Sequence, residues 1–197
     1  MIQDISTVTA LRKLYLSLAQ KRVKPGSGSS LSLLLARTWR FPMFDLRTLI
    51  IVPFVVVGGV ATRLYSPERM TDDLDILVHA DHSAQIAREA PECDLLPDGV
   101  RLDVTLSREK WAEEALAKPA FGPNDLPIIA LPFLVLMKMQ ASRGIDIGDL
   151  TRMLGAADDA SLTQARWVIQ SYLQDGVKDL DGLIQLGRLE YQQGQRD

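Results

Sequence analysis

The hydrophobic positions of the chain form short runs separated by polar turns, and the spacing within a run is typical either of a strand or of a helix. The most apolar stretch, residues 48–61, is rich in β-branched side chains and predicts a buried strand that reaches the pair Gly58-Gly59. Residues 54–57 form the clearest part of this strand, and a short helix is expected near residues 60–65. The segment therefore reads as a strand, a glycine turn and a helix, in that order.

Two more strands and one helix are predicted after this segment. Residues 74–78 are an apolar run broken by Asp75, and residues 100–106 contain Asp103 between apolar neighbours, so that both runs predict strands. The residues between them, 83–90, predict a helix. Strands that alternate with helices are typical of an α/β core.

Helical patterns flank this core on both sides. The helices that we expect lie at residues 7–22, at 31–40, at 133–142, at 146–157, after a capping box at 161–164, and at 180–191. Asp146 is a predicted N-cap. The predicted fold class is α/β (α+β), with an N-terminal helical segment at residues 1–45, an α/β core at 46–130 and a C-terminal helical region at 131–197.

Composition and charge exclude several classes of protein. The chain has 197 residues, of which 47% are hydrophobic and 24% charged, as in ordinary globular proteins, which excludes a disordered or collagenous chain. Its net charge of -3 excludes a globally basic nucleic-acid binder, although Lys21, Arg22 and Lys24 leave room for a local basic face. The single cysteine, Cys93, cannot form a disulfide within the chain, so we expect a cytoplasmic protein.

No membrane partner is expected from the sequence. The most apolar stretch contains Pro53 and is shorter than the roughly 20 residues that a spanning helix needs. The first residues lack the basic and then apolar order of a signal peptide.

Three aspartates carry the most informative chemistry. Side chains two residues apart in a strand point to the same face, so Asp73 and Asp75 are expected to project together. Two carboxylates about 4 Å apart repel by roughly 4 kcal/mol at an effective dielectric constant near 20, which a cation or a proton must offset. If the strand that carries Asp103 is a neighbour, three carboxylates converge, which is a ligand set for two Mg²⁺ ions. The alternative is a solvated acidic turn and an exposed strand residue.

The glycine pair fits the same chemistry. Without a Cβ, Gly58 and Gly59 let backbone amides approach a phosphate closely at the start of a helix, whose dipole favours anions. The alternative is a plain tight turn.

These features occur in a characteristic order. They are the strand, Gly58-Gly59, a helix, Arg69 and Thr71, the strand with Asp73 and Asp75, and the strand with Asp103. This order resembles the polymerase-β-type nucleotidyltransferase superfamily, and within it the small prokaryotic proteins grouped with AbiEii-type abortive-infection toxins. The resemblance covers about residues 55–154. It implies a mixed-sheet nucleotidyltransferase core, with Gly58 and Gly59 holding the triphosphate and the three aspartates holding Mg²⁺, for which Mn²⁺ can substitute.

The resemblance also implies roles for residues outside the carboxylate set. Asp103 matches a carboxylate that can activate the attacking hydroxyl, and Arg69 and Thr71 either contact the nucleotide or brace the turn. Further along the chain, Lys138 is expected to contact a phosphate of the nucleotide. The alternative is that its side chain extends to solvent from an apolar helix. Three further residues are expected to line or support the pocket: Arg143, Asp146 and Asp149. Gly59 stands where many members of the superfamily have serine, so that a hydroxyl contact to phosphate is missing.

Two functions of different classes are predicted. The first is Mg²⁺-dependent transfer of a nucleoside monophosphate from an NTP to a hydroxyl of RNA, protein or a small molecule, with release of pyrophosphate; tRNA is one such acceptor. The second is a catalytically weak nucleotide-binding or partner-binding module. A cognate antitoxin-like protein is a partner on family analogy alone.

Overall fold

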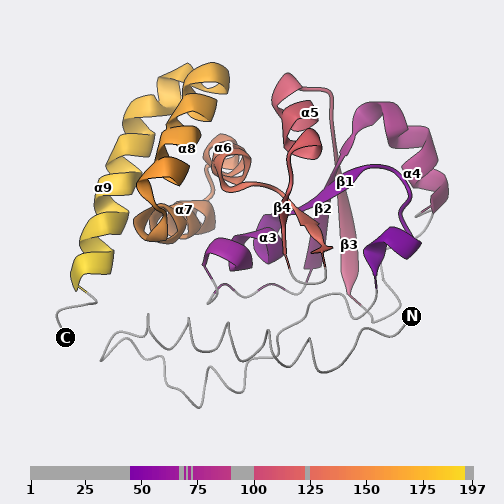
Figure 1. Cartoon of the computed structure of the whole chain (residues 1–197), viewed down its shortest axis with the longest axis horizontal. Coiled ribbons are helices and arrows are strands. Elements are labelled where there is room, and N and C mark those ends of the chain that lie inside the picture. Colours follow the sequence, from indigo (N-terminus) through magenta and orange to yellow (C-terminus); the bar gives the residue numbers. More distant parts are fainter. Residues whose placement is uncertain are drawn as a thin grey trace, which may run out of the picture.

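A five-stranded mixed sheet lies at the centre of the computed structural model, which describes residues 45–66, 69, 71, 73–89, 100–122 and 125–193 (Figure 1). Its strands are β1 (Phe54–Val57), β2 (Asp73–His79), β3 (Arg101–Ser107), β4 (Ala120–Phe121) and β5 (Pro127–Ile128). They lie in the order β3-β2-β1-β5-β4. The pairs β1–β2 and β4–β5 are antiparallel, whereas β2–β3 and β1–β5 are parallel. The predicted α/β (α+β) class is confirmed.

Short helices surround the sheet. They are η1 (Leu46–Thr48), α3 (Gly58–Tyr65), η2 (Ala80–His82), α4 (Ser83–Glu89) and α5 (Lys110–Ala117). Both α3 and α5 pack against β1 and β2. All four residues of β1 are buried, as is expected for a β-branched strand at the centre of a sheet.

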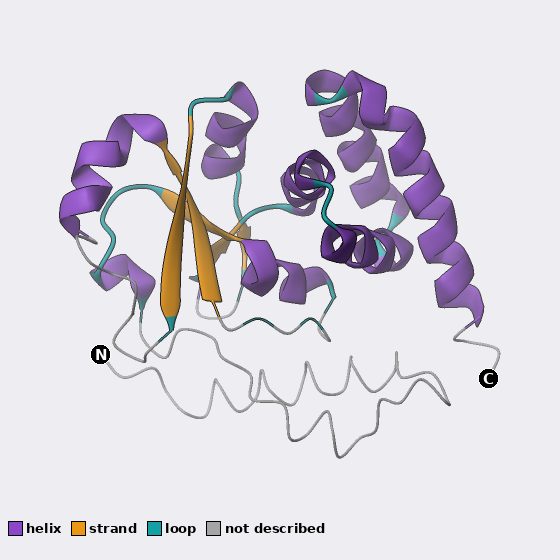
Figure 2. Ribbon diagram, turned by 180° about the vertical axis from the view of Figure 1, so that it is seen from behind, coloured by secondary structure: helices purple, strands orange, loops and turns teal. Residues whose placement is uncertain are grey.

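A group of helices stands beside the sheet, and Figures 1 and 2 show it from opposite sides. It comprises α6 (Leu131–Ala141), α7 (Gly144–Ala156), α8 (Asp159–Tyr172), η4 (Gln174–Gly176) and α9 (Val177–Gln193). Helix α6 is apolar on nearly all sides because it packs against α3 and α5 as well as α7 and α8. It therefore joins the helices to the sheet through a continuous hydrophobic core.

Helices α7 and α9 approach each other unusually closely. A Cβ built on Gly155 would lie 2.4 Å from the carbonyl oxygen of Gly187, and one on Gly187 would lie 2.2 Å from the carbonyl oxygen of Thr151. Only hydrogen fits at these two positions, so the glycines set the distance between the helices.

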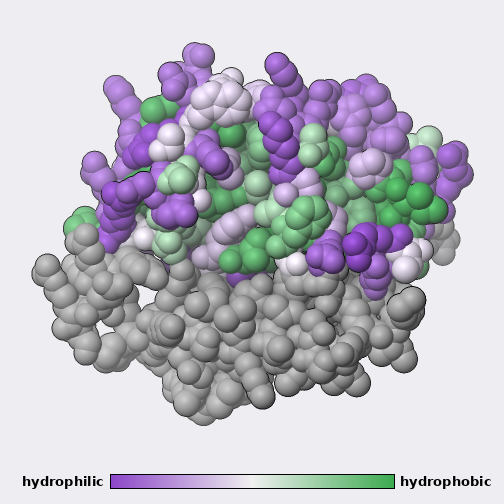
Figure 3. Space-filling model, viewed as in Figure 1, coloured by the Kyte–Doolittle hydropathy of each residue, from purple (hydrophilic) through white to green (hydrophobic). Residues whose placement is uncertain are grey.

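Polar surface surrounds this core. In Figure 3 hydrophilic residues occupy most of the upper rim of the molecule, and hydrophobic ones gather toward the middle of the same face. Within the described part of the chain, no helix has both the length and the apolar character needed to cross a bilayer.

Several predicted boundaries differ from the structure. The strand predicted at residues 54–57 is confirmed as β1, but the rest of the apolar stretch at 48–61 is not strand: Thr48 ends η1, residues 58–61 belong to α3, and Pro53, which has no N–H for a neighbouring strand, directly precedes β1. Helix α3 begins at Gly58 rather than near residue 60, directly after the strand. The predictions at residues 74–78, 83–90 and 100–106 correspond to β2, α4 and β3 within two residues at each described end.

The caps of the C-terminal helices also differ. Asp146 is not the N-cap of α7: the helix begins at Gly144, and Asp146 accepts the Arg143 N–H from inside the first turn. Helix α8 is capped by Asp158, whose carboxylate accepts the Ser161 N–H at 2.7 Å, so the predicted capping box lies within the helix. The helices expected at residues 7–22 and 31–40, together with Cys93, lie outside the described residues.

Candidate active site

Four charged side chains share one face of the β2–β3 pair. The parallel register sets Asp75 opposite Asp103 and Asp73 opposite Arg101. Since side chains two residues apart in a strand point the same way, all four project from the same face. On the other side of β2, Val57 at the end of β1 lies opposite Asp75. The two carboxylate-bearing strands are thus neighbours, and the chain leaves β1 beside Asp75.

The glycine turn is packed directly against these carboxylates. Gly58 has a φ of 63°, a left-handed conformation that favours glycine, and a Cβ there would overlap the Asp75 carboxylate. A Cβ on Gly59 would lie 2.6 Å from the Cβ of Thr71. Asp75 therefore lies at the N-terminal end of α3, where the positive end of the helix dipole favours a negative charge. No side chain fits at Gly58 or Gly59, so the surface of this turn consists of backbone atoms only.

The charges in the site are unevenly neutralised. Burial raises the pKa of Asp75, and the negative charges of Asp73 and Asp103 raise it further. The hydrogen bond from the Thr71 hydroxyl lowers the pKa of Asp73, and Arg101 adds to this effect. Among the described residues Asp75 forms no ion pair, so the carboxylate at the centre of the site is the one left without a counter-ion.

A buried arginine that the sequence pattern did not single out holds the segment before β2. Arg63 is 1% exposed, and its Nε donates to the carbonyl of Arg69 at 2.8 Å. Its Nη2 donates to the carbonyl of Thr71 at 2.9 Å. Arg63 therefore fixes the backbone that carries Arg69 and Thr71. An arginine near the end of a short helix ordinarily indicates a solvated position, so the sequence carried no clear signal for this role.

Arg101 is the second charged residue that the sequence pattern did not single out. Its Nη2 lies 2.8 Å from Asp103 Oδ2 and 3.2 Å from Asp73 Oδ2, so it bridges two of the three carboxylates. The strand period could have found it, because Arg101 precedes Asp103 by two residues and must share its face.

A buried ion cluster lies between α6 and α7. The Lys138 side chain is 7% exposed, and its Nζ donates to Asp146 Oδ1 at 3.1 Å and to Asp149 Oδ2 at 2.7 Å. Although burial opposes it, hydrogen bonds from Arg143 and Lys138 lower the pKa of Asp146. Lys138 is held inside the protein rather than directed to solvent, and its contact with phosphate stays a prediction.

The cluster is tied to the carboxylate site by two arginines. Arg69, just before β2, donates from Nε to Asp149 Oδ2 at 3.2 Å. Arg143 pairs with Asp146 at 2.7 Å, and its charge is also felt by Asp75. Of the predicted site residues, the structure therefore brings Gly58, Gly59, Thr71 and the three aspartates together. The other predicted residues form the adjoining cluster: Arg69, Lys138, Arg143, Asp146 and Asp149.

The donor set suits a hard cation, although the side chains do not converge on one point. Within the described ranges, no three His, Cys, Asp or Glu side chains are grouped closely enough to hold a metal ion as they stand. Arg101 lies between two of the carboxylates instead. Carboxylate oxygens are ligands that Mg²⁺ prefers, and the crowding that raises the Asp75 pKa is what a divalent cation offsets. The residues therefore suit such an ion in the chemistry of their donor atoms, though not in their present spacing.

No family model matches the chain, and no curated protein matches it in sequence. The likeness to nucleotidyltransferases therefore rests on the residues named above.

Proposed function

We propose that the chain is a Mg²⁺-dependent nucleotidyltransferase, which moves a nucleoside monophosphate from an NTP to an acceptor hydroxyl and releases pyrophosphate. The observation that carries this proposal is the position of Asp75. The carboxylate of Asp75 is packed against Gly58, where the chain turns into the N-terminus of α3. Asp75 also pairs with Asp103 on the neighbouring strand. An anion-binding backbone beside crowded carboxylates is the combination that a metal-nucleotide complex requires.

The glycine turn is suited to the triphosphate. The start of α3 has no acidic residue in its first turn and no side-chain cap. No side chain of the turn itself covers the positive end of the helix, which attracts anions, although Asp75 and Thr71 are packed against the two glycines. Gly58 is partly exposed, whereas Gly59 and the residues that follow it in the first turn are buried, so the amide of Gly58 is the donor that we assign to phosphate.

The carboxylates would hold the metal. Asp73, Asp75 and Asp103 are the ligands that we assign to Mg²⁺, which when bound neutralises the phosphates and orients the attacking and leaving oxygens. Asp103 also has a second task. Its side chain is 45% exposed on the outer strand β3, so an acceptor from solvent can reach it.

The reaction then follows from the positions of these groups. The acceptor oxygen forms a bond to the α-phosphorus while the bond from that phosphorus to the bridging oxygen breaks. Asp103 takes the hydroxyl proton, and pyrophosphate leaves with the bridging oxygen. The buried Lys138–Asp149–Arg69 connection keeps the segment before β2 in place during this exchange. A cytoplasmic location belongs to the same proposal.

A second candidate function is a nucleotide-binding or partner-binding module with little catalysis. The bridge from Arg101 to Asp73 and Asp103 favours it, because those carboxylates are neutralised without a metal. An antitoxin-like partner belongs to this alternative.

The test uses α-labelled NTPs, each incubated with the full chain, Mg²⁺ and one acceptor at a time: bulk tRNA, total protein or the chain itself. The double variant Asp73→Asn, Asp75→Asn removes two assigned ligands, and Asp81→Asn is a matched control at the other end of β2, where the side chain is 68% exposed. Label transferred by the wild type and by Asp81→Asn, but not by the double variant, supports the transferase and names the acceptor class. NTP binding without transfer supports the binding module, and neither binding nor transfer overturns both.

A further inference from the structure

Arg101 lies between the carboxylates of Asp73 and Asp103 and contacts both. One nitrogen, Nη2, lies within 3.2 Å of an oxygen from each carboxylate. The register explains this position, since Arg101 is level with Asp73 across the strand pair and shares a face with Asp103. The Arg101 side chain is 56% exposed, so it can swing into solvent without opening the core.

The neighbouring cations do not offer an equivalent contact. Arg143 acts on Asp75 only through its charge, and its Nε is engaged by Asp146 at 2.7 Å. Lys138 is buried between two other aspartates. Among the described residues, Arg101 is thus the basic side chain in direct contact with the carboxylates of β2 and β3.

We propose that Arg101 is a built-in competitor of the divalent cation, which neutralises Asp73 and Asp103 in the metal-free protein and leaves them when a metal binds. The inference rests on the proposed function, because it takes those aspartates as metal ligands. A guanidinium is held by carboxylates and attracted by phosphates alike. The carboxylates can therefore exchange Arg101 for the metal while Arg101 exchanges carboxylate for a phosphate of the incoming nucleotide.

This exchange predicts how the free protein binds metal. Without nucleotide the cation must displace Arg101, so its affinity is reduced. With nucleotide the displaced guanidinium gains a new anionic partner, so metal and nucleotide bind together more tightly than either does alone.

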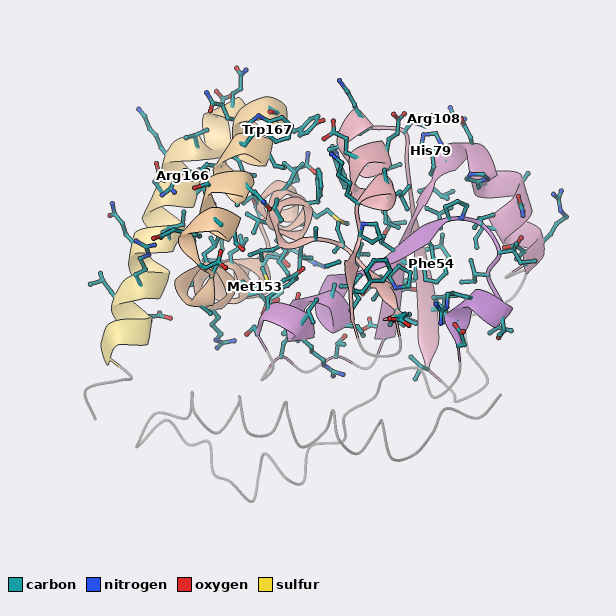
Figure 4. All side chains as sticks on the ribbon, viewed as in Figure 1. Phe54, His79, Arg108, Met153, Arg166 and Trp167 are labelled. Atoms are coloured by element: carbon teal, nitrogen blue, oxygen red, sulfur yellow. The ribbon has the colours of Figure 1, made fainter. Side chains whose placement is uncertain are left out.

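The test measures Mn²⁺ affinity by calorimetry on the full chain without nucleotide. Arg101→Gln is expected to bind Mn²⁺ about threefold to tenfold more tightly than the wild type, the range that follows from two partly exposed ion pairs. Arg101→Lys keeps the charge but not the planar fork, and is expected to lie between the two. Arg108→Gln is the matched control: this residue follows β3 at its other end, its side chain is 75% exposed, and Figure 4 shows it beside His79, away from α3. Its affinity is expected to equal that of the wild type.

Thermal unfolding gives a second measurement. In EDTA the Arg101→Gln variant is expected to melt below the wild type, because Asp73 and Asp103 lose their counter-ion, and saturating Mn²⁺ is expected to close the gap. Equal or weaker Mn²⁺ binding by Arg101→Gln overturns this inference and leaves the proposed function standing. No Mn²⁺ binding by any variant overturns both.

Discussion

Asp75 and Gly58 are packed so closely that a Cβ on the glycine would lie 1.9 Å from Asp75 Oδ2. The carboxylate at the centre of the site therefore depends on the absence of a side chain on the turn that follows β1. Because Gly58 also has a φ of 63°, its conformation and its packing impose the same requirement.

Gly58→Ala is expected to lower the free energy of unfolding by at least about 1 kcal/mol, from left-handed strain alone, and to displace Asp75. Urea unfolding measures the first effect, and loss of Mn²⁺ binding measures the second. Gly148→Ala in α7 is the matched control, since a Cβ there meets nothing within 4 Å. Unchanged stability and binding in Gly58→Ala would contradict the geometry of the turn.

Lys138→Met is expected to destabilise the protein by about 3–5 kcal/mol, because it leaves two buried carboxylates with fewer partners. Urea unfolding measures this loss, with the exposed Lys178→Met as control. Full stability combined with weaker NTP binding would instead assign Lys138 to phosphate rather than to the internal cluster.

Asp146→Asn is expected to have a pH-dependent effect. The pKa of Asp146 lies below its ordinary value of 3.8, so its ionised form stabilises the folded state above that pH, and the contribution is lost as the pH falls through the lowered pKa. Unfolding experiments between pH 7 and pH 3 should therefore show a constant deficit for the variant near neutrality that shrinks below about pH 4. A deficit of the same size at every pH would indicate lost packing instead.

Gly187→Ala is expected to lower the free energy of unfolding by about 1–3 kcal/mol. The added methyl group would overlap backbone atoms of α7, which cannot move away as a flexible side chain could. Gly182→Ala in the same helix meets nothing within 4 Å and is expected to stabilise by up to about 1 kcal/mol through helix propensity. Melting temperatures that move in the same direction for both variants would refute the close contact.

The sequence predicted the parts of the fold that depend on local pattern. The valines of β1 and the apolar run around Asp75 identified two neighbouring strands of the sheet. The glycine pair directly after the valines identified the turn at the end of β1. Strands β4 and β5, of two residues each, are too short to leave a periodic signal. Asp146 was misplaced as an N-cap because capping depends on where the helix begins, which here is decided by the αL residue Ser142 that ends α6.

The candidate site was predicted as a set of residues but not as a set of contacts. Strand alternation was enough to align Asp73, Asp75 and Asp103. The partners of Asp149 lie 11 and 80 residues away, and no local rule relates them. Arg63 was overlooked because an arginine is ordinarily assigned to solvent, and Arg101 was overlooked although strand alternation places it on the face of Asp103.

The two hydrogen bonds that Asp149 accepts affect where the chain can be truncated. One carboxylate oxygen receives both Lys138 from α6 and Arg69 from the segment that leads into β2. A fragment that stops near residue 130 would keep every strand of the described sheet but would lose α6, α7 and the ion pair between Arg69 and Asp149. A minimal version of this protein should therefore be designed to include α7, rather than cut where the chain changes from strands to helices.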